Sequence, residues 1–432
     1  MTRHTLTFAL CLWLSSPVRT QPLPTREIAE VACLHVDCGQ DTLQFPGGRE
    51  HFDSLRCVLD TLLATGRGRL NILHIGGSHV QAGSFSHRVR ADLTSATGPT
   101  AAGRGLLFPF TAMKSNAPES YAMWHEGKWT FSRCVGREPR LPLGLAGACL
   151  ETSDTAARVF IDMASLSLWR TDTLRVLGEG SAPDVVPVFV WNADTLAPLP
   201  PDGLPGFRFV LPAEADTCSL SFRGLVADSL SFCLRGVLTE SHAPGITYSE
   251  AGINGASVPS WLRCTLLEQD LALVPPSLVI FGIGINDANV WPQSFSSEQF
   301  KENYRELIRR IRSVSPRCCF LFITNNDCWF NFRGRRRTFN TNTPRVQQAM
   351  RELAAEVDGA VFDVFALMGG LRSSNAWVRA RLQRPDHIHF TREGYELWGD
   401  LLYNALATSL HPSKGEDDSR DDSTDTSEAG EP

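Results

Sequence analysis

The sequence is poor in several features that define whole classes of protein. After its first twenty residues it has no apolar run long enough to cross a membrane, so we expect no membrane span. It has no two CxxC pairs and no histidine-rich cluster at zinc spacing, which argues against a structural metal. We therefore expect no structural metal.

The folded part of the chain also lacks a charge of one sign. The net charge of the 432 residues is -6, and residues 411–432 alone carry eight acids against Lys414 and Arg420, also -6. The rest of the chain is nearly neutral and offers no basic face, so nucleic acid is not an expected partner. Residues 411–432 lack aromatic and large aliphatic side chains, which predicts a solvated, disordered acidic tail.

The N-terminus reads as a targeting segment. Arg3 and His4 precede an apolar run from Leu6 to Leu14, and small residues follow, which is typical of a secretory signal peptide over residues 1–20. We expect a product that is periplasmic, on the cell surface or extracellular. Export would permit disulfides among the twelve cysteines, for instance between Cys33 and Cys38, although most can equally be small buried hydrophobes.

Beyond about residue 245, strand and helix patterns alternate. Apolar runs at Ser277 to Ile283, Cys319 to Thr324 and Ala360 to Phe365 predict buried strands. Amphipathic stretches predict helices from about Ser296, over Pro344 to Val357, and over Thr391 to Ser409. This alternation predicts a parallel sheet with helices on both faces.

The middle of the chain differs, because short alternating runs separated by Pro, Gly and Asp predict an antiparallel β-sandwich. We expect it to interrupt the parallel sheet as an inserted domain, since a strand pattern at Ile72 to Ile75 precedes it. The predicted division is residues 1–20, signal peptide; 21–113, N-terminal segment and first part of the α/β domain; 114–245, β-sandwich insert; 246–410, remainder of the α/β domain; and 411–432, tail.

Four polar patterns follow predicted strands or precede the last helix. They are Gly76-Gly77-Ser78, Gly252 to Ser257, Gly284-Ile285-Asn286-Asp287 and Asp386-His387-Ile388-His389. In a parallel sheet these places converge on the edge where open α/β sheets carry their chemistry. Each alone has a simpler reading: a serine after two glycines is commonly a turn or helix cap, and Asn and Asp are ordinary turn formers.

Taken together, the four patterns resemble those of the SGNH, or GDSL-like, hydrolase family. Order and residue types match over roughly residues 70 to 110 and 245 to 410. The serine block with its following His-Val-Gln-Ala-Gly, together with the insert, further resembles bacterial peptidoglycan and carbohydrate O-acetylesterases. The resemblance implies a flavodoxin-like, three-layer α/β/α parallel sheet with an inserted antiparallel β-sandwich.

The resemblance also implies roles for individual residues. Ser78 would be the nucleophile, His389 the general base and Asp386 the carboxylate that orients the imidazole. The backbone N–H groups of Ser78 and Gly255 and the side-chain amide of Asn286 would form the oxyanion hole. No cofactor belongs to this set.

Neighbouring residues leave alternatives open. His387 is a second candidate base, with a different spacing from Asp386, or a loop histidine. His79 either contacts substrate or makes a structural hydrogen bond. Asp287 is interpreted as an organiser of its loop. The serine block departs from the family in having Gly77 where an aspartate is usual, so we expect weaker preorganisation of the oxyanion loops.

The expected function is an exported serine esterase that deacetylates an O-acetylated polysaccharide, peptidoglycan or another glycan. Trp124, Trp129, Trp169 and Trp191 either offer sugar-stacking faces or fill the sandwich core, and the basic, aromatic segment Phe330 to Phe339 either rims the site or is a solvated loop. Two other functions stay open. One is a catalytically impaired glycan-binding protein, which Gly77 suggests, and the other is a lipid esterase or thioesterase with the same residues.

Overall fold

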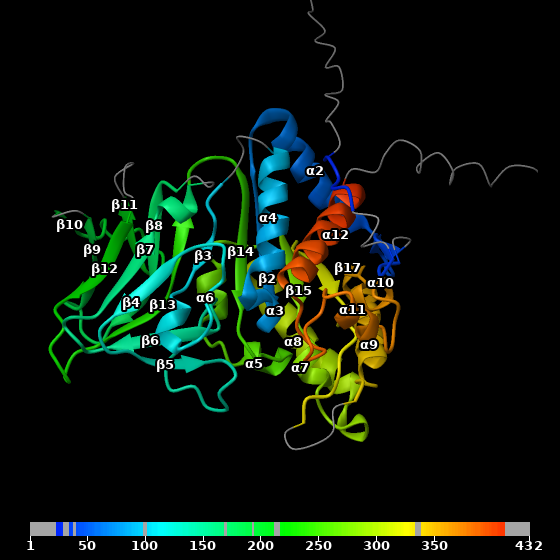
Figure 1. The fold of residues 1–432 in the computed structure, drawn as a ribbon. Coiled ribbons are helices and arrows are strands. Elements are labelled where there is room, and N and C mark those ends of the chain that lie inside the picture. The colour runs from blue at the N-terminus through cyan, green and yellow to red at the C-terminus, as the bar shows by residue number, and fades with distance from the viewer. Residues whose placement is uncertain are drawn as a thin grey trace, which may run out of the picture.

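A six-stranded sheet flanked by helices lies beside a sandwich of two further sheets (Figure 1). This computed structural model describes residues 23–28, 34–37, 40–97, 102–167, 171–191, 194–210, 217–332 and 338–410. The predicted signal peptide, the acidic tail, Cys33, Cys38 and Trp169 lie outside these residues. No helix in the described part of the chain is long and apolar enough to cross a membrane.

The six-stranded sheet carries the strands that the sequence predicts on either side of the insert. Its order is β1 (Leu43–Gln44), β17 (Ala360–Phe362), β16 (Cys319–Ile323), β15 (Leu278–Gly282), β2 (Arg69–Gly76) and β14 (Gly245–Gly252). The last five strands run parallel. The short β1 pairs antiparallel with β17 and was not predicted. The predicted strand from Ala360 ends at Phe362, because Asp363 caps the helix α10 (Val364–Leu367) by accepting the N–H of Ala366.

Successive residues of each central strand point to opposite faces of this sheet, and both faces are buried. In β15, Leu278 and Ile280 pack on one face while Val279 and Phe281 pack on the other. Continuous apolar runs such as this are what a strand covered on both sides requires. This explains why the sequence pattern identified these strands correctly.

Helices cover the two faces. One face carries α2 (Glu50–Thr65), α4 (Ser84–Thr97) and α12 (Arg392–Leu410), which pack on one another and on the sheet (Figure 1). The other carries α5 (Val258–Leu262), α6 (Leu267–Leu271), α8 (Ser297–Val314) and α9 (Thr343–Val357). The result is a three-layer α/β/α body, and the predicted helices α8, α9 and α12 lie within a residue of their expected bounds.

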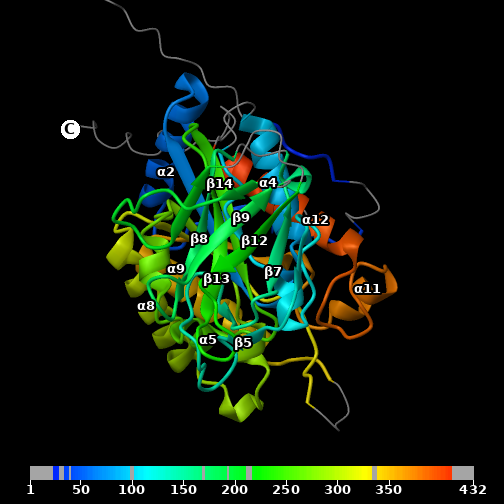
Figure 2. The ribbon, with the colours of Figure 1, turned by 90° about the vertical axis from the view of Figure 1, so that its left-hand side faces the viewer.

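The sandwich consists of two antiparallel sheets. One has the order β10 (Asp194–Leu196), β9 (Val186–Trp191), β12 (Thr217–Arg223), β7 (Arg158–Asp162) and β4 (Met123–Glu126). The other has the order β11 (Phe207–Val210), β8 (Thr173–Gly180), β13 (Phe232–Glu240), β6 (Ala148–Thr152) and β5 (Thr130–Arg133), and the short β3 (Leu106–Leu107) also pairs with β13. Figure 2 shows these strands in front of the helical body.

The sandwich is an insertion into the parallel sheet. β2 and β14 pair directly over eight residues, although the whole sandwich lies between them in the sequence. The interior of the sandwich is continuous with the core on the α8 and α9 side of the sheet, since one cluster of buried residues includes Phe189 and Phe281. The fold class expected from the sequence is therefore confirmed, and the insert is packed against the parallel sheet.

Candidate active site

Ser78 stands where β2 gives way to a short helix, α3 (Ser78–Ala82). The two preceding glycines differ in what they contribute. A Cβ on Gly76 would lie 2.2 Å from the side chain of Val80 and 2.8 Å from the carbonyl oxygen of Gly282, so only glycine fits there. A Cβ on Gly77 would meet nothing closer than the Ala256 carbonyl oxygen at 3.4 Å. The tight turn thus depends on Gly76, whereas a Cβ on Gly77 would make only ordinary van der Waals contacts.

His389 and Asp386 lie at the end of the loop before α12 and meet Ser78 across the sheet edge. The Ser78 hydroxyl and the His389 Nε2 are 2.8 Å apart. The His389 Nδ1 and the Asp386 Oδ2 are also 2.8 Å apart. The structure therefore brings the predicted serine, histidine and aspartate into one continuous hydrogen-bonded chain.

The carboxylate of Asp386 also fixes its own loop. Its Oδ1 accepts the backbone N–H groups of Ile388 and His389, each at 2.9 Å. Desolvation pushes the pKa of the Asp386 carboxyl up, but the His389 side chain and the two N–H groups outweigh it and hold that pKa well below its usual range. The group is therefore an anion at neutral pH, suited to holding an imidazole by its Nδ1–H.

The two other histidines of these blocks have different partners. His387 Nδ1 lies 2.8 Å from the Ser374 hydroxyl, and its ring stacks on Trp329 with centroids 3.8 Å apart. His79 is buried, and its Nδ1 lies 2.7 Å from the Tyr395 hydroxyl. Burial, with the His389 ring next in effect, lowers the pKa of His79 to about 3, so it is neutral. His79 therefore makes the structural hydrogen bond that was one of its two sequence readings.

Gly255 and Asn286 face the same edge from neighbouring loops. Gly255 has a φ of 81°, a left-handed conformation that favours glycine. The Asn286 Nδ2 donates to the carbonyl oxygen of Ala256 at 2.9 Å, which ties the two loops together. Because a carboxamide has two N–H donors, this bond uses one and leaves the other for a further acceptor.

Asp287 also joins the Asn286 loop to the Gly255 loop. Both of its carboxylate oxygens lie 3.2 Å from the backbone N of Val258, which donates to them. The residue keeps some exposed surface, but its carboxyl group is enclosed, and this burial raises the pKa to about 7. Asp287 lies away from the Ser78 hydroxyl chain and organises its loop, as its sequence reading proposed.

Sequence reasoning missed a polar network centred on Gln81, one turn beyond Ser78 in α3. The buried Gln81 Oε1 accepts the backbone N–H of Asn254 at 2.7 Å. Its Nε2 donates to the Ser115 hydroxyl at 2.7 Å and to the Asn116 carbonyl oxygen at 2.9 Å. Asn254 in turn donates from its Nδ2 to the Asn116 Oδ1 at 2.6 Å. Gln81 therefore joins the serine helix, the Gly255 loop and the segment leading into the sandwich.

A second group of polar residues that the sequence did not predict lies directly after β16 and supports the His389 loop. The residues directly after this strand are all buried and polar, namely Thr324, Asn325, Asn326 and Asp327. Asn326 donates from its Nδ2 to the carbonyl oxygen of Ile388 at 3.1 Å, and Gln383 donates to the carbonyl oxygen of Asp327 at 3.2 Å. The signal was available, because this polar run follows a predicted strand at the same sheet edge.

A cleft of about 640 Å³ opens over these groups. Ser78, His389, Gly255 and Asn286 all line it. Most of the remaining lining side chains are polar or charged, including Asn116, Glu119, Asn254, Asn289, Asn331, Asn340, Arg384 and Arg392. The geometry therefore places a hydroxyl, an imidazole and several amide donors around one solvent-accessible space.

Comparison with known proteins identifies the hydrolase part of the chain. Residues 217–397 match the GDSL-like Lipase/Acylhydrolase family. The matched range includes Gly255, Asn286, Asp386 and His389. Ser78 lies before this range in the sequence, but the fold brings its hydroxyl into contact with His389. The matched part of the chain carries the sequence pattern of the SGNH (GDSL-like) hydrolases. No curated protein sequence matches it.

Solved structures add the fold of the whole molecule. A structure described as "Peptidoglycan O-acetylesterase in action" aligns with a TM-score of 0.67 at 21% identity, covering 86% of this chain and 99% of that one. An acetyl xylan esterase, AlAXEase, aligns with a TM-score of 0.30 at 18% identity over 37% of this chain and 81% of that one. The lipase/acylhydrolase from Enterococcus faecalis aligns with a TM-score of 0.30 at 22% identity over 39% and 80%.

The first alignment spans the insert as well as the hydrolase body, so this SGNH hydrolase shares its two-part fold with that structure. The family match makes the protein a serine ester hydrolase. The sequence-based assignment to this family, and to ester hydrolysis, is thereby confirmed. The domain boundaries and the roles of single residues stay predictions.

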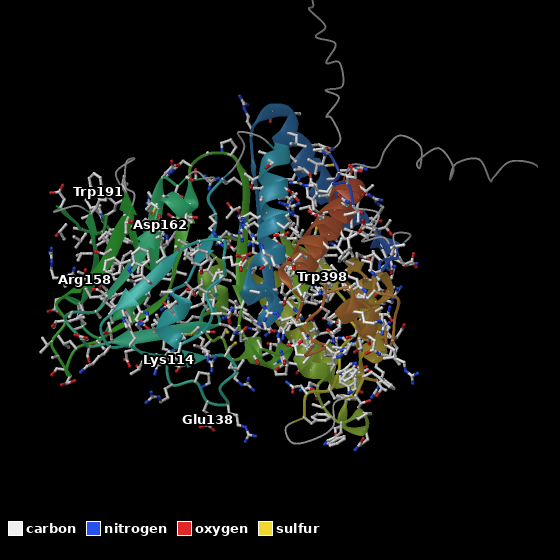
Figure 3. The ribbon with its side chains drawn as sticks, viewed as in Figure 1. Lys114, Glu138, Arg158, Asp162, Trp191 and Trp398 are labelled. Atoms are coloured by element: carbon white, nitrogen blue, oxygen red, sulfur yellow. The ribbon has the colours of Figure 1, made fainter. Side chains whose placement is uncertain are left out.

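The tryptophans of the sandwich do not share one environment. Trp124 is 41% exposed and stacks on Phe160, with ring centroids 5.3 Å apart. Trp129 is half-buried, and its indole N–H donates to the carbonyl oxygen of Glu126 at 2.8 Å. Trp191 lies at the far side of the sandwich from Trp398 of α12 (Figure 3). Trp124 therefore has an exposed face, whereas Trp129 packs against the sandwich core.

The aromatic segment after β16 does reach the site. Trp329 and Asn331 line the cleft, and the Asn331 backbone N–H donates to the Asn289 side-chain oxygen at 2.9 Å. Residues 333–337, which hold the three consecutive arginines of this segment, lie outside the described residues. Within the predicted segment Phe330 to Phe339, Asn331 therefore rims the cleft, while Phe330, Phe332 and Phe339 line a separate pocket.

Proposed function

We propose that this hydrolase is an exported esterase that removes O-acetyl groups from a polysaccharide. The observation that carries the proposal is the continuous chain of hydrogen bonds from Ser78 through His389 to Asp386 at the floor of a polar cleft. The proposed location rests on the N-terminal segment, with its basic start, apolar run and small residues.

In the first step, the Ser78 oxygen attacks the acetyl carbonyl carbon while the His389 Nε2 takes the hydroxyl proton. The 2.8 Å separation of these atoms suits direct transfer. Asp386 accepts the Nδ1–H of His389, which keeps Nε2 free to act as the base and stabilises the imidazolium that forms. His387 is turned toward Ser374, so we assign the base to His389.

The tetrahedral intermediate places a negative charge on the former carbonyl oxygen. The backbone N–H of Ser78 is a suitable donor, since the first N–H groups of a helix lack partners within it. The N–H of Gly255 and the second N–H of Asn286 complete the set. Each such donor typically stabilises the transition state by about 3 to 4 kcal/mol.

The intermediate then collapses to an acetyl-enzyme. His389 gives its proton to the leaving sugar oxygen, and the C–O bond to the sugar breaks. A water molecule then attacks the acetyl carbonyl carbon while His389 takes its proton. The bond to the Ser78 oxygen breaks, His389 returns the proton to that oxygen, and acetate leaves. No group from outside the chain other than water enters this cycle.

The polysaccharide assignment rests on the cleft and on the solved structure that shares the two-part fold. A lining rich in carboxamides suits sugar hydroxyls, which both donate and accept hydrogen bonds. The structure that shares the two-part fold is described as a peptidoglycan O-acetylesterase. We therefore place O-acetylated peptidoglycan first among acetylated glycans as the substrate.

The test is acetate release from O-acetylated peptidoglycan fragments, measured beside a series of chromogenic esters from acetyl to octanoyl. We expect acetate release from the glycan and a steep loss of rate as the acyl chain lengthens. Preference for the long acyl esters would instead indicate a lipid esterase or thioesterase. Glycan binding without turnover of any ester would indicate the impaired binding protein that Gly77 suggested.

A further inference from the structure

Two buried cysteines from different parts of the fold lie against each other. Cys134 directly follows β5 of the sandwich, and Cys264 lies just beyond α5 of the hydrolase body. Both are free thiols in the structure, and their side chains lie side by side. The neighbouring Arg263 donates from its Nη1 to the carbonyl oxygen of Cys134 at 2.9 Å, and neither cysteine has exposed surface.

This contact lies beside the Gly255 loop. Val135, the residue after Cys134, has its Cγ1 4.0 Å from where a Cβ on Gly255 would stand. On the other side, the carbonyl oxygen of Cys264 accepts the Nη2 of Arg310, on α8, at 2.6 Å. The cysteine pair thus lies between the sandwich and the segment from Gly255 to Cys264. This segment is bound to α8 and begins at a proposed oxyanion donor.

We propose that Cys134 and Cys264 form a disulfide bond that fastens the inserted sandwich to the hydrolase body beside the Gly255 loop. The thiolate of one cysteine attacks a sulfur of a small-molecule or protein disulfide in the oxidising compartment and releases one thiol. The second thiolate displaces the other half and closes the Cys134–Cys264 bond. Two protein thiols lose two protons and two electrons, and the oxidant's disulfide is reduced to two thiols.

The bond should form while the protein folds. Contact with Cys134 and burial raise the pKa of the Cys264 thiol well above its usual range, so little reactive thiolate exists in the folded protein. An exported chain meets oxidants before it has buried its thiols. The exported location proposed above therefore supplies the condition that this bond requires.

A second thiol contact in the described chain has a less suitable geometry. The side chains of Cys149 of β6 and Cys233 of β13 also lie side by side, and both thiols are free in the structure. In the register of these antiparallel strands Cys233 lies opposite Glu151, which puts Cys149 on the diagonal. Diagonal residues are about 7 to 8 Å apart, while the Cα atoms of a disulfide are usually within about 7 Å. We therefore expect Cys149 and Cys233 to stay as thiols.

The test is a map of the disulfides in the full chain exported to the periplasm of a bacterial host. Free thiols are blocked under denaturing, non-reducing conditions, and the digest is analysed by mass spectrometry before and after reduction. We expect a cross-linked peptide pair that joins Cys134 to Cys264 and disappears on reduction. Recovery of both cysteines as blocked thiols, or a bond from either to another cysteine, would overturn the proposal.

Stability supplies a second readout with a matched control. A bond that closes a loop of this length restricts the unfolded chain, so a reductant should lower the Tm of the exported protein by about 5 to 10 °C. The double variant Cys134→Ser, Cys264→Ser should start at the lower Tm and show no response to reductant. Cys218→Ser, which changes another buried cysteine, should keep the response. An equal response in the double variant would contradict the assignment. Neither readout requires esterase activity, so the two proposals can fail separately.

Discussion

The side-chain oxygen of Gln81 accepts the backbone N–H of Asn254 at 2.7 Å, and this bond joins the helix of the proposed nucleophile to the loop of a proposed oxyanion donor. Ser78 and Gln81 lie within the same short helix, and Gly255 directly follows Asn254. The Gln81 carboxamide therefore helps to fix the relative position of Ser78 and Gly255, beside the pairing of β2 with β14. Gln81 is a positioning residue that touches no reacting atom.

Replacing Gln81 tests this link. Gln81→Met keeps the length of the side chain but removes the acceptor for Asn254 N–H, and we expect kcat for a chromogenic acetyl ester to fall about 10- to 100-fold with little change in KM. Gln81→Glu keeps the acceptor and should retain more of the activity. Steady-state kinetics beside thermal unfolding separates the two effects. Equal kcat values for Gln81→Met and the wild type would remove Gln81 from the account.

Asn286 tests the oxyanion hole itself. Asn286→Ala removes a donor to the developing charge, so we expect kcat to fall about 100- to 1000-fold. It also removes the bond to the Ala256 carbonyl oxygen, which should cost about 1 kcal/mol of unfolding free energy. Asn289→Ala, another cleft carboxamide, is the matched control and should lose far less kcat. A similar loss in both variants would mean that the effect is not specific to Asn286.

Replacing Gly77 tests the effect of the glycine that stands where the family usually has an aspartate. Its φ of -98° is outside the left-handed region, and an added Cβ would lie 3.5 Å from the Asn286 Nδ2. A carboxylate at this position can accept a hydrogen bond from that amide and restrain it. We expect Gly77→Asp to raise kcat about two- to tenfold, the effect of roughly one hydrogen bond, while Gly77→Ala leaves it nearly unchanged. A fall in kcat for Gly77→Asp, with normal folding, would show that Gly77 is required.

The enclosed carboxyl of Asp287 predicts a pH dependence of stability. Its pKa is about 7 in the folded protein, above the ordinary value near 4 of an unfolded chain. The folded state therefore binds more protons between these values, and this group makes the protein less stable as pH rises from about 4 to about 7. Asp287→Asn abolishes this effect, so its stability relative to the wild type should increase over the same range and then level off.

Urea unfolding at several pH values measures this difference, and Asp386→Asn is a control of opposite sign. The folded pKa of Asp386 is depressed, so its contribution to stability is fully present above about pH 4 and is lost only as the pH falls through the depressed value. The cost of Asp386→Asn should thus stay constant between pH 5 and 8. A flat difference for Asp287→Asn over that range would contradict the raised pKa.

Much of the fold follows from local pattern. The runs around Leu278 and Cys319 were recognisable as strands because both of their faces are apolar, and the blocks that follow them carry the polar groups of the site. The edge strand β1 was missed, because a two-residue strand exists only through its pairing with β17. Its sequence offers no period to detect.

In the site, too, residues in local sequence patterns were predicted, and residues whose role depends on distant contacts were not. Ser78, Asp386 and His389 were predicted because their residue types and spacing match a family pattern, and the structure joins them in one chain. Gln81 lies in the serine block, but its role could not be predicted from the block. Its hydrogen-bond partners come from segments more than 30 residues away. A carboxamide that bridges distant loops has no local signature, so only the assembled fold reveals it.

The central claim is that the Ser78 hydroxyl accepts the acetyl group, and one measurement tests it most directly. Acetate release from O-acetylated peptidoglycan fragments is compared for the wild type and for Ser78→Ala, whose fold is checked by thermal unfolding. We predict measurable turnover by the wild type and a loss of at least about 1000-fold in Ser78→Ala, because the covalent route is closed. Undiminished acetate release by a folded Ser78→Ala variant would contradict the account.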